Sequence, residues 1–290
     1  METIGLSFDI EDWFCVQNMK DVIPFNQWNQ CESRVYENTE YLLKTLKKNN
    51  IKATFFVLAW IAERIPELVY DIASDGHEIA SHGYSHSLIT HMTKKEFQTD
   101  LEKSISILTN LTGKPIYGYR APSFSITRET MWALEILKKN GIKYDSSIYP
   151  IKHPDYGIAG FQQDIHEING IIEVPLTTST IYGLNIPISG GGYFRLYPYW
   201  FSKMMLQRQM AYSRPITYFH PWEFDSGQPR INLPWFKKFR HYVGLEKNRN
   251  KFEKLLQAFY FAPIENIIRD HRMNRGQPAG PMVFHQEVAY

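Results

Sequence analysis

The sequence has little cysteine, no long hydrophobic run and almost no net charge. Its 290 residues include two cysteines, Cys15 and Cys31, and a chain of this size has no need of a disulfide, so we expect both thiols to be reduced. The longest apolar run, residues 53–62, is about half of the roughly 20 residues that a transmembrane helix needs. The 32 basic and 30 acidic side chains give a formal charge of +2, which disfavours a nucleic-acid binder that relies on net positive charge.

The remaining composition is that of an ordinary globular protein. With 43% hydrophobic and 21% charged residues the chain can bury a large core, which disfavours intrinsic disorder. Residues 1–9 lack the basic and long apolar stretches of a signal peptide and enter a strand-like pattern at once, so we expect a cytoplasmic protein. Aromatic residues make up 15% of the chain, which indicates either a heavy core or a cleft lined with rings for a flat ligand such as a sugar.

Short β-rich runs alternate with helical patterns along most of the chain. This alternation predicts an α/β fold with repeated βα units and a largely parallel sheet. A capping box that begins at Thr93 and a stop at Gly113 bound one expected helix, and two further helices are expected over residues 131–137 and 198–210. The expected strands are residues 4–8, 53–58, 78–81, 116–119, 142–144, 171–174 and 216–219.

The C-terminal part of the chain differs from the rest in charge. Residues 226–290 carry 11 basic and 5 acidic side chains, a net charge of +6, whereas residues 1–225 carry a net charge of −4. We therefore predict a barrel domain over residues 1–225 and a basic C-terminal extension, residues 226–290, packed on the barrel. The basic face favours an anionic glycan, a nucleotide-linked sugar or an acidic membrane surface, with a merely solvated surface as the alternative.

Five reactive side chains lie just beyond predicted strands: Asp9, His82, Arg120, Asp145 and His220. In a parallel β/α barrel the carboxyl ends of the strands converge on one face, where active sites are built. We therefore expect these side chains to line one site.

Two histidines and three carboxylates provide candidate ligands for a metal ion. His82 and His86 are four residues apart, a spacing that lets two imidazoles reach one divalent ion such as zinc. Asp9, Glu11 and Asp12 follow the first strand. A hydrolytic metal site needs one carboxylate to complete the ligands and another to accept a proton from water, so we expect different carboxylates to fill these roles.

The other strand-end residues have acid–base or structural interpretations. Arg120 can hold a carboxylate in bidentate geometry or form a structural ion pair, and His220 can protonate a leaving group. Asp145 can orient that histidine or cap the following turn. The three glycines at residues 190–192 lack the ending of a phosphate loop, so we interpret them as a flexible active-site loop or a turn.

Together these residues resemble the polysaccharide deacetylases of carbohydrate esterase family 4, the NodB-homology group. The similarity covers nearly the whole chain, and the segments look like those of the subgroup found with bacterial exopolysaccharide and O-antigen biosynthesis, which bears an extra C-terminal region. The similar segments follow the family's order: residues 7–9, 82–86, 119–122, 145–150, 190–195 and 220–225.

The resemblance implies a fold and an activity. The fold would be a distorted (β/α)7-type barrel with a C-terminal appendage, and the activity would be removal of N-acetyl groups from sugars with one divalent metal ion, usually zinc. Asp9 would be the general base, oriented by Arg120. His220 would be the general acid, with Asp145 as its partner.

The resemblance also implies His82 and His86 as metal ligands, but the first motif departs from the family pattern. Ile10 stands where the family has its metal-binding aspartate. Glu11 or Asp12 would then supply the third ligand. Family members with an Asp-x-Asp arrangement favour Glu11 and the shorter side chain favours Asp12, so both stay open.

The resulting prediction is a metal-dependent deacetylase of an N-acetylated amino sugar in a bacterial surface-polysaccharide pathway. Ser123, Tyr193 and Trp222 are predicted to contact the substrate, which is polymeric, lipid-linked or nucleotide-linked. We expect no nucleic-acid partner, and peripheral contact with a membrane stays open. One alternative is an amidohydrolase of small non-sugar amides, similar to allantoinase. Another is a glycan-binding protein whose catalytic site has decayed, which is suggested by Ile10 at the position of the family's metal-binding aspartate.

Overall fold

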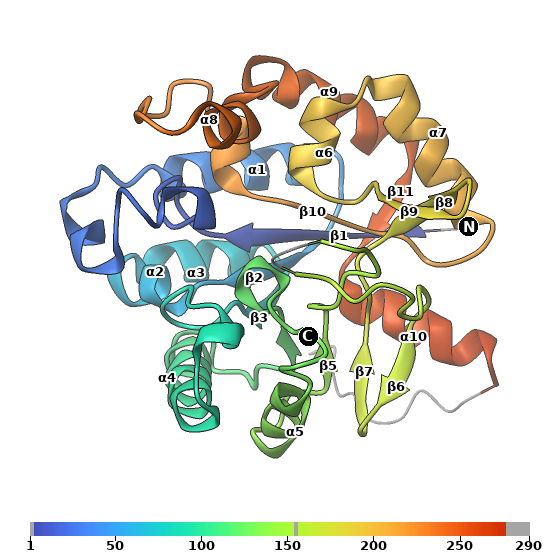
Figure 1. The fold of residues 1–290 in the computed structure, drawn as a ribbon, viewed down its shortest axis with the longest axis horizontal. Helices are drawn as coiled ribbons and strands as arrows, with labels where there is room; N and C mark the ends of the chain where they lie inside the picture. The colour runs from blue at the N-terminus through green and yellow to red at the C-terminus, as the bar shows by residue number, and fades with distance from the viewer. Residues whose placement is uncertain (1–2, 154–155, 277–290) are drawn as a thin grey trace, which may run out of the picture.

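The computed structural model describes residues 3–153 and 156–276 (Figure 1). Its main sheet has the strand order β10-β1-β2-β3-β4-β5-β7-β6, and β11 also pairs with β1. Neighbouring strands are parallel except for β6 and β7, which are antiparallel. The sheet curls into a half-barrel, which confirms the predicted α/β class.

The strands are short apart from the first. Those of the main sheet are β1 Thr3–Ile10, β2 Thr54–Val57, β3 Glu78–Ser81, β4 Gly118–Tyr119, β5 Tyr144–Asp145, β6 His166–Ile168, β7 Ile171–Glu173, β10 Ile216–Phe219 and β11 Tyr260–Ala262. A separate antiparallel pair consists of β8 Thr178–Ile181 and β9 Leu184–Pro187.

Helices surround the outside of the curled sheet (Figure 1). The α-helices are α1 Val35–Lys48, α2 Ala59–Arg64, α3 Pro66–Ser74, α4 Lys94–Thr112, α5 Trp132–Lys139, α6 Gly191–Leu196, α7 Tyr199–Met210, α8 Trp235–Tyr242, α9 Leu245–Ala258 and α10 Ile264–Asn274. Short 3-10 turns are η1 Gln17–Met19, η2 Phe25–Gln30, η3 Ile89–His91, η4 Pro122–Phe124 and η5 Pro221–Phe224.

Strand β1 shows how the sequence aims side chains into the barrel. Successive side chains of a strand point to opposite faces. Phe8 and Ile10 belong to the large hydrophobic cluster that packs against the helices. Ser7 and Asp9 therefore face the barrel interior, where both accept hydrogen bonds from Arg120. The alternation thus places the Asp9 carboxylate inside the barrel, near the carboxyl end of β1.

Local signals at helix ends are also confirmed. Thr93 caps α4 by accepting a hydrogen bond from the backbone N–H of Glu96, whose carboxylate accepts one from the backbone N–H of Thr93. Gly113 ends the helix with a φ of 66°, a left-handed conformation that glycine adopts without steric cost.

The seven predicted strands are all present, with ends that differ from the prediction by at most two residues, but several elements were not expected. Among them are β6, the β8–β9 pair, α8 and α10. The three glycines at residues 190–192 were interpreted as a flexible loop or turn, and this was wrong, because Gly191 and Gly192 begin α6. The C-terminal segment also contributes strand β11 to the main sheet, where it pairs in parallel with the start of β1. The boundary at residue 225 stays a prediction.

Two absences concern the described part of the chain. Every helix in residues 3–153 and 156–276 is too short or too polar to cross a membrane. Cys15 and Cys31 are free thiols, as expected.

Candidate active site

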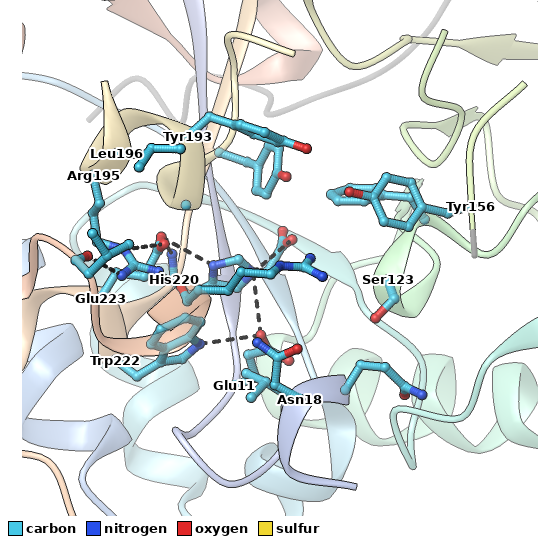
Figure 2. Close-up of a pocket in the computed structure, with 18 of the residues that line it drawn as sticks. Glu11, Asn18, Ser123, Tyr156, Tyr193, Arg195, Leu196, His220, Trp222 and Glu223 are labelled. Carbon is cyan, nitrogen blue, oxygen red and sulfur yellow. Dashed lines mark hydrogen bonds and ion pairs between the residues drawn. The ribbon is translucent and has the colours of Figure 1, made fainter. Parts of the chain in front are cut away.

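A pocket of about 450 Å³ lies at the carboxyl ends of the strands (Figure 2). This volume is in the range of small-molecule sites. Of the five strand-end residues singled out from the sequence, Asp9, His82 and His220 line the pocket, and Arg120 contacts Asp9. The fifth, Asp145, is described below. The lining also holds the aromatic side chains Phe124, Tyr156, Tyr193, Tyr218, Trp222 and Phe239.

Glu11, His82 and His86 form a buried group at the floor of this pocket. One nitrogen or oxygen atom from each lies within 4.8 Å of the others. Nδ1 of His82 is 2.8 Å from the backbone carbonyl of Arg120, an acceptor, so Nδ1 carries the proton and Nε2 keeps its lone pair. Nε2 of His86 lies 2.7 Å from Oε2 of Glu11. Two imidazoles and one carboxylate are a ligand set that divalent zinc prefers.

The chemistry of these three groups fits a cation. Oε2 of Glu11 is buried, and its neighbour is Nε2 of His86, with no further donor in the described part of the chain to satisfy it. Burial opposes ionisation of Glu11, but His86 and His220 outweigh it and lower its pKa to about 2. Burial lowers the pKa of His82 to about 4. At neutral pH the group therefore offers an ionised carboxylate and a neutral imidazole, the forms that bind metal.

The loop that carries His86 is held by a side chain the sequence did not single out. Asp100 accepts hydrogen bonds from the backbone N–H groups of Tyr84 and Ser85, at 2.8 and 3.2 Å, and from the Ser85 hydroxyl at 2.8 Å. A Cβ at Gly83, where φ is +74°, would lie 3.0 Å from the Asp100 carboxylate. Glycine at this position thus permits both the turn and the close approach of Asp100.

Asp12, the other candidate for the third ligand, is directed away from the histidines. Burial raises the pKa of the Asp12 carboxyl, and hydrogen bonds from four donors partly oppose this rise. The same hydrogen bonds hold the carboxyl in place. These donors are the backbone N–H groups of Trp13, Arg34 and Val35 and the hydroxyl of Ser33, at 2.8 to 3.1 Å. Asp12 therefore ties the first loop to the start of α1, and the structure brings Glu11 to the two histidines.

Arg120 holds Asp9 in a fixed orientation. Its Nη1 donates to Oδ1 of Asp9 at 2.7 Å and to the Ser7 hydroxyl at 2.9 Å. Its Nε and Nη2 donate to the backbone carbonyl and the hydroxyl of Ser146. Both members of the ion pair are buried, and the guanidinium also lies 4.0 Å from the ring centre of Phe56. With Oδ1 engaged, Oδ2 of Asp9 faces the site.

His220 lies between carboxylates on both sides (Figure 2). Its Nε2 is 3.3 Å from Oε1 of Glu11 and 3.8 Å from Oδ2 of Asp9, and its Nδ1 is 3.2 Å from Oε2 of Glu223. Burial opposes the charged imidazolium, but Glu11, Glu223 and Asp9 together raise the pKa of His220 to about 9. The imidazole is therefore protonated at neutral pH.

Asp145 does not occupy the place expected for it. It was predicted to be the partner of His220, but Glu223 contacts Nδ1 of that histidine instead. Asp145 accepts hydrogen bonds from the backbone N–H and hydroxyl of Ser147 and shares one with Glu173. Burial raises the pKa of Asp145 to about 6. Its place inside the barrel wall matches the capping alternative more closely.

Glu223 and Arg195 are the site residues that the sequence reasoning missed. Glu223 is three residues after His220 in η5, so its side chain folds back over the histidine, and this spacing is a signal that was available. Arg195 Nε donates to Oε1 of Glu223 at 3.0 Å, and both side chains are about 1% exposed. A Cβ at Gly191 would lie 1.8 Å from Oε2 of Glu223, so glycine is required there.

The three predicted substrate contacts all line the pocket. Figure 2 shows Ser123 opposite Tyr193, with Trp222 below His220. Ser123 has a φ of 49°, a costly conformation for a residue other than glycine and one that clusters at functional sites. Trp222 stacks on His220 with ring centres 5.3 Å apart and on His241 at 4.5 Å.

The pocket walls also include two segments that the sequence reasoning did not assign to it. One is formed by Val16, Gln17 and Asn18, and the other by Phe239 and Arg240 of α8. The C-terminal extension thus borders the site.

Comparison with known proteins identifies two segments of the chain. Residues 18–144 match the family described as polysaccharide deacetylase, and residues 146–269 match a domain of unknown function, DUF3473. The chain is similar to a peptidoglycan deacetylase of Helicobacter pylori, with 39% identity over 107 residues, which are 37% of this chain and 36% of the relative. It is similar to a peptidoglycan-N-acetylglucosamine deacetylase of Bacillus cereus, with 37% identity over 34% of this chain and 36% of the relative.

The match thus spans about a third of the length of these curated relatives. The fold is similar over almost the whole chain to the crystal structure of a Mycobacterium smegmatis protein assigned as a polysaccharide deacetylase. The TM-score is 0.59 at 19% identity, covering 95% of this chain and 92% of the other. The chain therefore contains a polysaccharide deacetylase domain of the NodB and carbohydrate esterase 4 family, followed by a DUF3473 region.

Proposed function

We propose that this protein is a metal-dependent deacetylase that removes the N-acetyl group of an amino sugar during synthesis of a bacterial surface polysaccharide, such as O-antigen, capsule or exopolysaccharide. The observation that carries the proposal is the convergence of three functional groups on one pocket. These groups are the Glu11, His82 and His86 cluster, the Asp9 carboxylate and the His220 imidazolium.

Glu11, His82 and His86 would hold one divalent ion, for which zinc is our expectation. When bound, such an ion supplies Lewis-acid polarisation of the amide carbonyl and makes a nearby water more acidic. Nδ1 of His82 donates a hydrogen bond to the Arg120 carbonyl, which leaves Nε2 unprotonated and available as a ligand.

Asp9 would act as the general base. Arg120 engages Oδ1, so Oδ2 is the oxygen that accepts a proton from the attacking water. The same ion pair prevents the Asp9 carboxylate from rotating. Arg120 therefore serves as a positioning residue for Asp9.

His220 would act as the general acid. Its Nε2 faces Glu11 and Asp9 and carries the proton that the departing amine needs. Glu223 accepts from Nδ1 and stabilises the charged imidazole, as the third member of a catalytic triad does. In our proposal Glu223, rather than Asp145, fills this role.

The substrate would lie among the aromatic side chains that line the pocket. The backbone N–H near Ser123 would donate to the oxyanion formed from the acetyl carbonyl, and Tyr193 and Trp222 would contact the sugar ring. A cytoplasmic enzyme of this kind would act on a precursor, linked to a lipid or a nucleotide, rather than on a finished polymer.

An acetate-release screen tests the proposal. Wild type and Asp9→Asn would be assayed on lipid-linked and nucleotide-linked N-acetylhexosamines, on N-acetylated polymers and on small cyclic amides, with and without chelator. Acetate release from a sugar that is abolished by chelator and by Asp9→Asn supports the proposal. Turnover restricted to small amides would favour the amidohydrolase alternative, and sugar binding without zinc or turnover would favour the decayed protein.

A further inference from the structure

Helix α8 exposes a row of aromatic side chains beside the active-site pocket. Trp235, Phe236 and Phe239 are 80%, 48% and 52% exposed. Trp235 and Phe239 are one turn apart and so lie on the same side of the helix. Figure 1 shows α8 at the periphery of the molecule. We call the exposed side of residues 235–240 the α8 surface.

An ordinary surface helix buries its apolar side, whereas α8 exposes its aromatic side chains. The buried residue of α8 is His241, which stacks on Trp222 and contacts Gln228 at 2.8 Å through Nε2. Arg195 fixes the end of the helix by donating to the backbone carbonyls of Arg240 and His241. The outward orientation of the aromatic side chains is thus anchored by buried contacts.

The α8 surface is also basic. Residues 235–242 include Lys237, Lys238 and Arg240 and no acidic residue. Lys237 pairs with Asp21 on the neighbouring segment. That segment exposes two more apolar side chains, Val22 at 42% and Phe25 at 44%. Aromatic and cationic groups therefore occur together over two adjacent segments.

This surface is continuous with the candidate active site. Phe239 and Arg240 line the pocket, whereas Trp235, Phe236 and Lys238 lie outside it. A partner that covered the α8 surface would therefore lie at the pocket mouth.

We propose that the α8 surface binds an anionic phospholipid bilayer and holds the pocket mouth at the membrane. Exposed aromatic and apolar side chains flanked by Lys and Arg are the combination that binds at the interface of anionic membranes. Because α8 lies at the periphery of the molecule with its rings exposed, those rings can reach the flat surface of a bilayer. The binding does not depend on the proposed function, but its consequence does: a deacetylase held there would take a lipid-linked amino sugar.

Vesicle sedimentation tests the binding with the full-length protein. Wild type should sediment with vesicles of phosphatidylglycerol and phosphatidylcholine, not with phosphatidylcholine alone, and the bound fraction should fall as salt rises. Trp235→Ser/Phe236→Ser should weaken binding at least about tenfold, and Lys238→Glu at least about fivefold. Both variants should keep wild-type thermal stability and wild-type turnover of a soluble substrate.

Two matched controls lie elsewhere on the molecule. Tyr212→Ser removes a ring that is 75% exposed next to the start of β10, and Lys48→Glu reverses an exposed charge at the end of α1. Both should bind vesicles like wild type. Equal loss in the controls and the α8 variants would overturn the proposal, as would a wild type that fails to sediment with anionic vesicles. It would also be overturned by a wild type that dimerises through Trp235 and Phe236 without binding vesicles.

Discussion

Oε2 of Glu223 lies 3.2 Å from Nδ1 of His220, while its other oxygen accepts a hydrogen bond from Arg195 at 3.0 Å. The hydrogen bond from Arg195 keeps Glu223 directed at His220, because a carboxylate held at one oxygen cannot turn away from the imidazole. His220, Glu223 and Arg195 all fall in the segment that matches DUF3473, whereas His82 and His86 fall in the segment that matches the deacetylase family. The candidate site therefore draws on both segments.

Glu223→Gln should lower kcat for acetate release by roughly 10²- to 10⁴-fold, the usual contribution of an acid–base group, with little change in KM. Removal of the negative charge also lowers the pKa of His220, which Glu11, Glu223 and Asp9 raise to about 9. The alkaline limb of the kcat profile should therefore move to lower pH. Steady-state kinetics between pH 6 and about pH 10 measure both effects. An unchanged alkaline limb would contradict the assigned role of Glu223.

Gly191→Ala should displace Glu223, because the added Cβ would lie 1.8 Å from its Oε2. We expect a loss of about 1–3 kcal/mol in the free energy of unfolding, together with a fall in activity. Gly192→Ala is the matched control, since the nearest atom to its Cβ, Nη2 of Arg195, is 4.0 Å away. Denaturant unfolding of both variants measures the difference, and equal destabilisation would show that Glu223 is not the limiting contact.

Glu11→Gln and Asp12→Asn should separate metal binding from loop structure. Glu11→Gln removes the ionised ligand beside His82 and His86, so zinc content measured by elemental analysis should fall well below one ion per chain. Asp12→Asn should keep its zinc but lose about 1–2 kcal/mol of stability, because its charged hydrogen bonds to the start of α1 weaken. Chelation of wild type should lower its melting temperature, and added zinc should restore it. Zinc lost from Asp12→Asn alone would assign the ligand to Asp12.

Glu265→Gln should raise the melting temperature more at pH 9 than at pH 5. Glu265 lies at the start of α10, and its backbone N–H donates to the buried Glu78 carboxylate at 3.2 Å. Burial and Glu78 raise the pKa of Glu265 from 4.5 to about 8. The folded protein therefore holds a proton that the unfolded chain releases, so stability falls as pH rises from about 4.5 to about 8. Thermal unfolding of wild type and Glu265→Gln at pH 5 and pH 9 measures the difference in melting temperature.

Glu246→Gln, an exposed position in the first turn of α9, is the control for that experiment. Its effect on the melting temperature should vary little with pH. If the effect of Glu265→Gln were equally independent of pH, repulsion between the Glu265 and Glu78 carboxylates would not lower the stability of the folded protein.

The parts of the fold that follow from local patterns could be predicted from the sequence. The ends of α4 depend on Thr93 and Gly113 within the helix itself, and the buried strands depend on short apolar runs. Strand β11 depends on pairing with β1, which is more than 250 residues away and which one sequence does not reveal as its partner. Strand β6 pairs with β7 across Asn169 and Gly170, a hairpin signal that the strand prediction did not use.

The candidate site shows the same division. Placement of Asp9, His82 and His220 at strand ends could be predicted because strand direction brings those ends together. The choice between Glu11 and Asp12 depends on the start of α1 competing for Asp12, a contact 22 residues away. The choice between Glu223 and Asp145 had one local signal, the spacing of three residues between His220 and Glu223. It also depends on Arg195 and on the space left by Gly191, which carry no local pattern.

Strand β1 has a further consequence for synthesis of the protein. Gly5 to Phe8 pair with Ile216 to Phe219, which are made about 210 residues later. At bacterial and eukaryotic elongation rates one edge of β1 waits roughly 10 to 40 s for this partner. An unpaired buried strand is a template for aggregation, so premature termination before residue 216 should yield insoluble fragments.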